Sequence, residues 1–393
     1  MQNFVQYAPT EVIFGKGTEE QTGAAVSKWG GSRVLIVYGG GSVVRSGLLK
    51  RVEESLEREN IIYEEFGGVR PNPRLEFAEE GVKKALAFKA DMILAVGGGS
   101  SIDTAKGIAH GAANPDLKLW DDIWMKQAPL TRSLPVGVVL TIPAAGSEMS
   151  DSAVLTNEKL GRKAGLNSEF NRVKFAIMNP ELAFTLPAFQ LACGITDIMM
   201  HTMERYFIPG IKCQLTDEIA EGLLRTVVEN GRIIMKNKED YDAMAEIMWC
   251  SSISHNNLTE AGRGKDFSVH KLGHALSAKY DVAHGASLAA VWGSWAKYIY
   301  GGAVDRFARY ARKVWGAEQE DDQAAALTGI AKTVEFFRFI GMPVSLKELG
   351  VKPSADDLKA LALDATRNDT LKLTRIRPLG AREVKEIFEL ANQ

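Results

Sequence analysis

The first half of the chain alternates short runs of apolar residues with longer amphipathic segments, and this alternation limits the folds open to it. The apolar runs fall at 33–40, 91–100 and 134–143, and segments with helical periodicity fall at 73–90 and 101–113. A strand that is apolar throughout is buried on both faces, as in a parallel sheet covered by helices. The pattern therefore predicts an α/β fold built on a parallel sheet.

The second half has a different pattern. Beyond about residue 187, nearly every segment repeats its apolar residues with a helical period, for example 217–237 and 304–316, and strand-like runs almost disappear. We therefore expect two domains, an α/β domain at 1–187 and an all-helical domain at 188–393.

The composition excludes several classes of partner. The net charge of −2 comes without a long basic run, so neither nucleic acid nor an anionic membrane is expected as a partner. The chain has no apolar stretch of about 20 residues, and its first residues lack the layout of a signal peptide. Its three widely spaced cysteines favour a reducing compartment over a disulfide framework. A cytoplasmic enzyme is the resulting expectation.

Two glycine-rich turns follow apolar runs of the first domain, "YGGGS" at 38–42 and "GGGSSIDTAK" at 97–106. Glycine lets a phosphate approach the backbone, and the N–H groups of a following helix attract its charge. The G-x-G-x-x-G fingerprint is absent, and a single such turn is also compatible with a helix entry that binds nothing. Two turns leaving parallel strands point to one crevice, which favours a Rossmann-like dinucleotide site.

The first turn also bears on the choice of dinucleotide. An acidic side chain near the end of a strand commonly holds the 2′-hydroxyl of NAD and repels a 2′-phosphate. Here the turn carries Gly39, Gly40, Gly41 and Ser42, with Arg45 nearby. Donors without a carboxylate favour NADP(H), while NAD(H) stays possible.

Histidines gather in the second domain, although the chain has six in all. His270 and His274 are four residues apart, so they share one face of a helix, and His284 follows ten residues later. Asp197 and His201 form a second pair with the same spacing. A lone helical histidine is more often structural than a ligand, but four histidines and an aspartate in two clusters indicate a metal site.

Imidazole and carboxylate ligands suit a borderline divalent ion such as Fe(II), Zn(II), Co(II) or Mn(II). No cysteine lies within the cluster, so a structural zinc finger is not expected. Five candidates exceed the four ligands of a tetrahedral site, which leaves one side chain for proton transfer.

These motifs carry a specific resemblance. Together with "NFVQYAPTEVIFGKGT", "VRPNP", "TIPAAGSEMS" and "NPELAFTLP", the stretches "GITDIMMHTMERYF" and "HKLGHALSAKYDVAHG" resemble the iron-containing (group III) alcohol dehydrogenases. Within that family, the likeness is greatest to the branch of butanol dehydrogenases and NADPH-dependent aldehyde reductases, and it runs from end to end. It implies a dehydroquinate-synthase-like α/β domain followed by a helical metal-binding domain, in a homodimer.

The resemblance also implies roles for individual residues. One divalent ion, Fe(II) or Zn(II), would be bound by Asp197, His201, His270 and His284, while His274 would relay a proton beside it. The residues implied in cofactor binding are Gly40, Gly41, Ser42, Asn72, Gly98, Gly99, Ser100, Asp103, Thr141 and Lys163. One departure concerns "TIPAAGSE", where Ala145 stands in place of the family's usual threonine and lacks a hydroxyl that commonly touches the cofactor.

The expected activity is hydride transfer between a nicotinamide and a primary alcohol or aldehyde. A glycerol or diol dehydrogenase of the same fold is the main alternative. A lyase is a weaker one, because its lysine and arginine cluster for phosphate is not evident, and the glycine turns argue against a hydrolase. A metal or nucleotide sensor without turnover is the remaining possibility. Nothing in the sequence ranks butanal above other aldehydes as the substrate.

Overall fold

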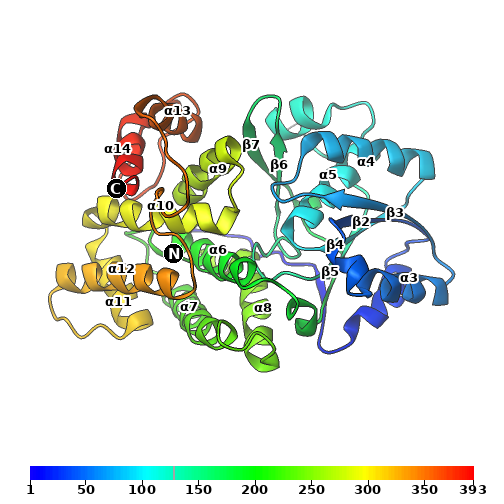
Figure 1. Cartoon of the computed structure of the whole chain (residues 1–393), viewed down its shortest axis with the longest axis horizontal. Helices are drawn as coiled ribbons and strands as arrows, with labels where there is room; N and C mark the ends of the chain where they lie inside the picture. The colour runs from blue at the N-terminus through cyan, green and yellow to red at the C-terminus, as the bar shows by residue number, and fades with distance from the viewer. Residues whose placement is uncertain (127–128) are drawn as a thin grey trace. The chain divides into compact units, whose positions relative to one another are not determined.

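We describe residues 1–126 and 129–393 of the chain from a computed structural model (Figure 1). These residues form two compact units, one of Tyr7–Leu186 and one that joins Met1–Gln6 to Pro187–Gln393. The first six residues thus group with the helical unit, although the ranges expected from the sequence assign them to the first domain. None of the helices in the described residues has the length and hydrophobicity to cross a lipid bilayer.

The α/β unit is built on a six-stranded sheet with the order β1-β8-β5-β4-β2-β3, and every neighbouring pair is parallel. This confirms the predicted fold class. The sheet strands are β1 (Glu11–Phe14), β2 (Arg33–Gly39), β3 (Ile62–Val69), β4 (Met92–Gly97), β5 (Val136–Leu140) and β8 (Phe175–Met178). A separate antiparallel hairpin joins β6 (Ser152–Asn157) to β7 (Arg162–Asn167).

Helices cover both faces of this sheet (Figure 1). Alternate residues of a strand point to opposite faces, and Val34, Ile36 and Leu94 share one apolar cluster with α1 and α3. The intervening Leu35 and Ile93 are also fully buried, on the face where α4 and α5 pack. The helical elements of this unit are η1 (Thr18–Gln21), α1 (Thr22–Lys28), α2 (Ser42–Arg45), α3 (Leu48–Arg58), α4 (Leu75–Phe88), α5 (Gly99–Ala113), η2 (Leu119–Met125), η3 (Glu169–Asn171) and η4 (Pro180–Ala183).

The strand order reverses direction next to β2. From β2 the chain first adds β3 on one side of the sheet and then adds β4, β5 and β8 on the other. In open α/β sheets, ligands bind outside the carboxyl ends of the strands at such a switch point. Because β2 and β4 end at Gly39 and Gly97, both glycine-rich turns lie there.

The second unit is helical throughout its described secondary structure from Pro187 onward, apart from a single bridge between Leu373 and Leu379. Its elements are α6 (Ala188–Tyr206), α7 (Gln214–Ile234), α8 (Tyr241–His255), η5 (Leu258–Glu260), α9 (Ser268–Tyr280), α10 (His284–Ile299), η6 (Tyr300–Gly302), α11 (Val304–Trp315), α12 (Asp322–Phe339), α13 (Ala355–Ala365) and α14 (Ala381–Ala391). Cys193, Cys213 and Cys250 are free thiols.

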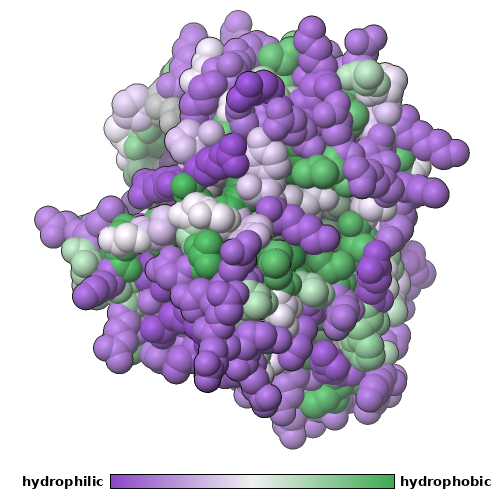
Figure 2. Space-filling model, turned by 90° about the vertical axis from the view of Figure 1, so that its left-hand side faces the viewer, coloured by the Kyte–Doolittle hydropathy of each residue, from purple (hydrophilic) through white to green (hydrophobic). Residues whose placement is uncertain are grey.

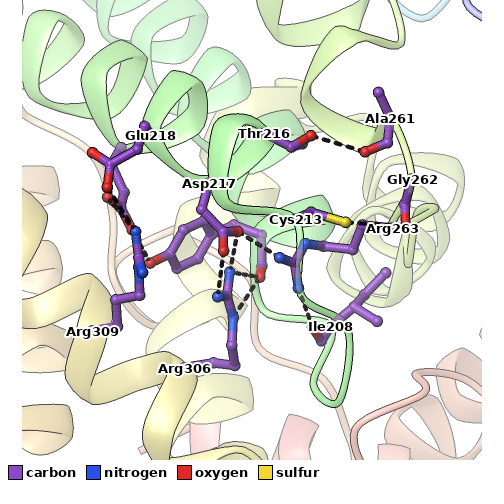
Figure 3. Close-up of polar contacts among 12 residues, drawn as sticks. Ile208, Cys213, Thr216, Asp217, Glu218, Ala261, Gly262, Arg263, Arg306 and Arg309 are labelled. Carbon is purple, nitrogen blue, oxygen red and sulfur yellow. Dashed lines mark hydrogen bonds and ion pairs between the residues drawn. The ribbon is translucent and has the colours of Figure 1, made fainter. Parts of the chain in front are cut away.

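A buried ionic network ties several of these helices together (Figure 3). Asp217 of α7 accepts hydrogen bonds from Arg263 Nη2 at 2.5 Å and from Arg306 Nη2 of α11 at 2.8 Å. Arg306 also donates to the backbone oxygen of Tyr206, the last residue of α6, and Arg263 donates to that of Ile208. Burying a charge costs much free energy unless the charge is paired and hydrogen-bonded, as these charges are. The network therefore anchors the end of α6 to α7, α11 and the segment before α9.

Figure 2 shows one face of the molecule, on which hydrophilic side chains dominate and hydrophobic side chains lie in small separate groups. Scattered apolar residues of this kind do not define a docking surface.

Candidate metal and nucleotide sites

One face of α6 carries the first acidic and imidazole side chains of the site. Asp197, His201 and Glu204 are spaced by four and then three residues, so they follow one another along the same face of the helix. All three are buried, with 4%, 3% and 1% of their surfaces exposed. An acid–imidazole–acid stripe with so little exposure has to find its polar partners inside the protein.

Two neighbouring helices supply the other histidines. His270 and His274 lie on α9, and His284 is the first residue of α10. Two glycines allow these helices to approach closely. A Cβ at Gly285 would lie 2.2 Å from the backbone oxygen of Cys193 on α6, and one at Gly273 would lie 2.7 Å from Leu288 of α10.

The three histidines predicted as ligands converge on one carboxylate oxygen. Asp197 Oδ1 lies 3.4 Å from His270 Nε2, 3.6 Å from His284 Nε2 and 3.8 Å from His201 Nδ1. The ligand atoms of Asp197, His201 and His270 all lie within 4.8 Å of one another. The helical unit thus brings together, at one point, the four residues that the sequence predicted as ligands.

This arrangement fits a divalent metal ion. Bonds of about 2.0–2.2 Å in a tetrahedral site place the ligand atoms about 3.3–3.6 Å apart, close to the distances found here. Buried His201 Nδ1 and His270 Nε2 make no hydrogen bond with the described residues, although buried ring nitrogens normally have a partner. An ion at the common point of these atoms would complete the bonding of both rings.

The ring pKa values reflect the crowding of charged groups. Burial, together with the nearby His255 and His270, lowers the pKa of His201 well below its ordinary value. Burial also works against a charged His270, but the carboxylates of Glu204 and Asp197 outweigh it and raise the pKa of His270 to about 9. Both shifts come from the same cluster, in which imidazoles face each other around two buried acids.

His274 is half-buried at the margin of the cluster. Its ring centre lies 5.3 Å from that of His284 and 6.2 Å from that of His270, nearly perpendicular to the latter. It is thus near two of the predicted ligands without belonging to the group of closest ligand atoms. The role of His274 as a proton relay, which the family resemblance implies, stays a prediction.

Two further residues of the cluster were not predicted from the sequence. The ring of His255, at the end of α8, lies 4.0 Å from that of His201, and Glu204 contacts His270 Nδ1. The spacing of Glu204 from Asp197, seven residues along one helix, is the signal that could have revealed it. His255 has no comparable signal, because its position depends on how α8 packs against α6.

The α/β unit places seven of the predicted cofactor-binding residues at the carboxyl ends of three adjacent strands. Gly40, Gly41 and Ser42 follow β2, and Gly98, Gly99 and Ser100 open α5 after β4. Thr141 directly follows β5, and its N–H donates to the carbonyl of Gly97. Gly97 has φ +157, and a Cβ there would lie 2.5 Å from Ser101 Oγ, so the turn into α5 requires glycine.

The remaining predicted cofactor residues lie near the β6–β7 hairpin. Lys163 Nζ on β7 donates to Asn72 Oδ1 at 3.0 Å, so these two residues are brought together. Asp103 lies on α5, where its two carboxylate oxygens accept hydrogen bonds from Ser147 Oγ and the backbone N–H of Val154. In this structure Asp103 therefore joins α5 to the hairpin.

Ala145 contacts the second glycine turn. A Cβ added at Gly99 would lie 3.2 Å from that of Ala145, so the two residues face each other across a close contact. The missing hydroxyl noted in the sequence therefore concerns the entrance of α5, where the predicted phosphate contacts lie.

Comparison with known proteins identifies the family of the chain. The model of the iron-containing alcohol dehydrogenases matches residues 9–180, and that of the C-terminal part of the same family matches residues 191–392. The chain belongs to the iron-containing alcohol dehydrogenase family. This confirms the resemblance predicted from the sequence.

Individual relatives cover nearly the whole chain. NADH-dependent butanol dehydrogenase A of Clostridium acetobutylicum is 39% identical over 99% of both chains. The NADPH-dependent aldehyde reductase YqhD of Escherichia coli is 34% identical, covering 89% of this chain and 90% of the relative. The crystal structure of an NADH-dependent butanol dehydrogenase A from Thermotoga maritima superimposes with a TM-score of 0.95, at 36% identity, covering 100% of this chain and 99% of that one.

Proposed function

We propose that this chain is a metal-dependent, NAD(P)-linked alcohol dehydrogenase or aldehyde reductase that acts on primary alcohols and short aldehydes such as the butanol–butanal pair. The observation that carries the proposal is the convergence of three imidazole nitrogens on Asp197 Oδ1, at 3.4–3.8 Å. Membership of the alcohol dehydrogenase family and the names of its butanol dehydrogenase relatives support the same activity.

Asp197, His201, His270 and His284 would hold one Fe(II) or Zn(II) ion. A bound divalent ion supplies a Lewis acid, which withdraws electron density from the oxygen of an alcohol or aldehyde. The four side chains would fix its place, and the burial of Asp197 and His201 would keep their contribution in a medium of low dielectric constant. The hydride itself is exchanged with the nicotinamide cofactor.

His274 would move the proton that accompanies hydride transfer. An imidazole has an ordinary pKa near neutrality, so its ring nitrogen can both accept and return a proton at physiological pH. Its ring lies 5.3 Å from that of His284 and is half-buried, which leaves it near the proposed metal ligands and partly accessible. It would accept the proton during alcohol oxidation and donate it during aldehyde reduction.

The α/β unit would bind the dinucleotide through Gly40, Gly41, Ser42, Asn72, Gly98, Gly99, Ser100, Asp103, Thr141 and Lys163. We propose NADP(H) as the favoured form because the first turn has no acidic side chain. Arg45 supports this choice because its guanidinium group lies beside the turn, where it could pair with a phosphate. A Cβ on Gly41 would lie only 3.3 Å from Arg45 Nη1. The names of the relatives divide between NADH and NADPH, so the preference rests on this turn alone.

A diol dehydrogenase is the second candidate. The 1,3-propanediol oxidoreductase structure superimposes on this chain with a TM-score of 0.88, at 26% identity, covering 99% of this chain and 100% of that one. Such an enzyme would use the same metal ligands, so only the substrate distinguishes the two proposals. We further propose that the protein is a cytoplasmic homodimer without nucleic acid or membrane partners, as the family resemblance and charge imply.

The direct test is an assay of NADPH and NADH oxidation with a panel of short aldehydes and hydroxyaldehydes. The protein would first be reconstituted with Fe(II) or Zn(II) and its metal content measured. Turnover of butanal, with NADPH preferred over NADH, supports the proposal. Preference for a hydroxyaldehyde over butanal supports the diol alternative. Metal and nucleotide binding without turnover of any carbonyl compound would contradict both.

A further inference from the structure

Glu204 connects the two helices that carry most of the proposed metal ligands. It lies on α6, one turn beyond His201, and its side chain has no exposed surface. One oxygen, Oε2, contacts His270 Nδ1 on α9. The other, Oε1, accepts a hydrogen bond from the backbone N–H of Val269 at 2.5 Å. A single carboxylate therefore holds both the ring of His270 and the start of its helix.

The contact with His270 determines which ring nitrogen is available to a metal. A carboxylate can only accept a hydrogen bond, so His270 Nδ1 has to carry a hydrogen and donate it to Glu204. The other nitrogen, Nε2, then points with its lone pair toward Asp197 Oδ1, 3.4 Å away. Metal-binding histidines are commonly oriented by a carboxylate in this manner.

The contact with Val269 fixes the position of the helix as well as that of the ring. Ser268 is the first residue of α9, so the N–H of Val269 is one of the donors that a helix leaves unsatisfied at its start. A negative charge at this end of a helix is also favoured by the helix dipole. Glu204 thereby sets the register of α9 against α6, on which the distance between His270 and Asp197 depends.

The charge of Glu204 is directed to His270, because the neighbouring cation is engaged elsewhere. Arg205 donates through Nε to Glu260 Oε2 at 2.8 Å and through Nη1 to the backbone oxygen of His201 at 2.6 Å. The two buried residues thus serve different ligands, with Glu204 holding His270 and Arg205 holding the backbone at His201.

We propose that Glu204 is a positioning residue that sets the affinity of the site for its divalent ion by fixing the ring orientation and tautomer of His270. This inference rests on the proposed metal site and adds a residue that neither the ligand set nor the comparisons include. Removing carboxylates that orient metal-binding histidines typically lowers metal affinity 10–100-fold.

The test is the substitution Glu204→Gln, which keeps the size of the side chain. Its amide oxygen can still accept from Val269, but its NH₂ group would face His270 Nδ1 and oppose a hydrogen there. Zn(II) affinity, measured by titration against a competing chelator, should fall about 10–100-fold. The matched control is Glu221→Gln, another buried carboxylate, which accepts from Tyr206 and Arg309 and contacts none of the proposed ligands.

Glu221→Gln should bind Zn(II) as tightly as the native chain, even where it lowers the melting temperature. Native affinity in Glu204→Gln would overturn the inference, and so would an equal loss in both variants, which would point to general destabilisation. A native chain that binds no Zn(II) would instead overturn the proposed function, so the two failures are distinguishable.

A second measurement needs no change at Glu204 and remains available if that variant does not fold. In a crystal structure of the Zn(II)-loaded native protein, the nitrogen of His270 that binds the ion can be identified directly. The inference predicts that Nδ1 carries the hydrogen and Nε2 binds the metal. Metal binding through Nδ1 of His270 would overturn it.

Discussion

The two units use their histidines in opposite ways. In the α/β unit, His110 is buried on α5, and both of its ring nitrogens have protein partners, Ser133 Oγ at 2.9 Å and Asn171 Oδ1 at 2.8 Å. In the helical unit, His201 Nδ1 and His270 Nε2 are equally buried but face Asp197 at 3.4–3.8 Å without a hydrogen bond. All three histidines are therefore buried, and what separates His110 from the two proposed ligands is that both of its ring nitrogens have protein partners.

A similar contrast holds for the chemistry of the two proposed sites. The proposed metal site consists of side chains whose chemical identities would be indispensable, because imidazole and carboxylate would be the ligands. The nucleotide turns consist mostly of backbone, and their glycines matter for space and conformation. We therefore expect substitutions to abolish function in the helical unit and to shift affinity or preference in the α/β unit.

The largest effect is expected from loss of a ligand. His270→Ala or His284→Ala should lose the bound metal, and kcat/KM should fall on the order of 10⁴-fold, because a Lewis acid is worth several kcal/mol. Metal analysis and aldehyde reduction should change together. His110→Gln is the control, and it should keep its metal; loss of metal in all three variants would erase the contrast between the units.

A smaller effect is expected at His274. His274→Ala should keep the metal and lose about 10³-fold in kcat, with a changed pH profile, because proton transfer by a positioned side chain contributes about 10²–10⁴-fold. Steady-state kinetics across pH, with metal content measured on the same sample, test this. A metal-free variant would assign His274 to the ligands, and an unchanged pH profile would remove its proposed role.

The structural histidine should make stability depend on pH. Burial lowers the pKa of His110 from 6.5 to about 4, so the unfolded chain binds a proton more readily than the folded one between these values. Stability contributed by His110 is therefore complete above about pH 6.5 and is lost as the pH falls toward 4. Between pH 8 and pH 5 the loss is about 2 kcal/mol.

This loss can be isolated by comparing native protein with His110→Gln. The variant should be less stable at pH 8, but its unfolding free energy should drop about 2 kcal/mol less on going to pH 5. Urea unfolding of both proteins at pH 8 and pH 5 gives the change in unfolding free energy for each. The contributions of all other titrating groups cancel when one change is subtracted from the other. Parallel pH dependence of both proteins would show that His110 does not titrate as the structure implies.

The smallest effect is expected at the first glycine turn. Gly40→Asp places a charge where a Cβ meets no atom within 4 Å, so the fold should tolerate it. Repulsion of the additional 2′-phosphate should raise the KM for NADPH about tenfold more than that for NADH, a difference equivalent to about 1.4 kcal/mol. Gly40→Ala controls for the added carbon. Equal changes with both cofactors would place the 2′-phosphate elsewhere.

The sequence predicted the fold class and the metal cluster because each has a strong local signal. Apolar strands identify the parallel sheet, and the paired spacing of Asp197 with His201, in a chain with few histidines, indicates the proposed ligands. Glu204 was missed because glutamate is common and its partner lies 66 residues away. The contacts of Asp103 with Ser147 and Val154 likewise depend on tertiary packing, which a periodic pattern does not encode.

We propose that Asp197, His201, His270 and His284 bind one divalent ion at a single common point. A crystal structure of the protein reconstituted with Zn(II) or Fe(II), with anomalous diffraction measured at the absorption edge of that metal, tests this most directly. One anomalous peak per chain is expected, about 2.0–2.2 Å from one atom of each of these four side chains. The absence of a peak there, or a peak bound by other residues, would contradict it.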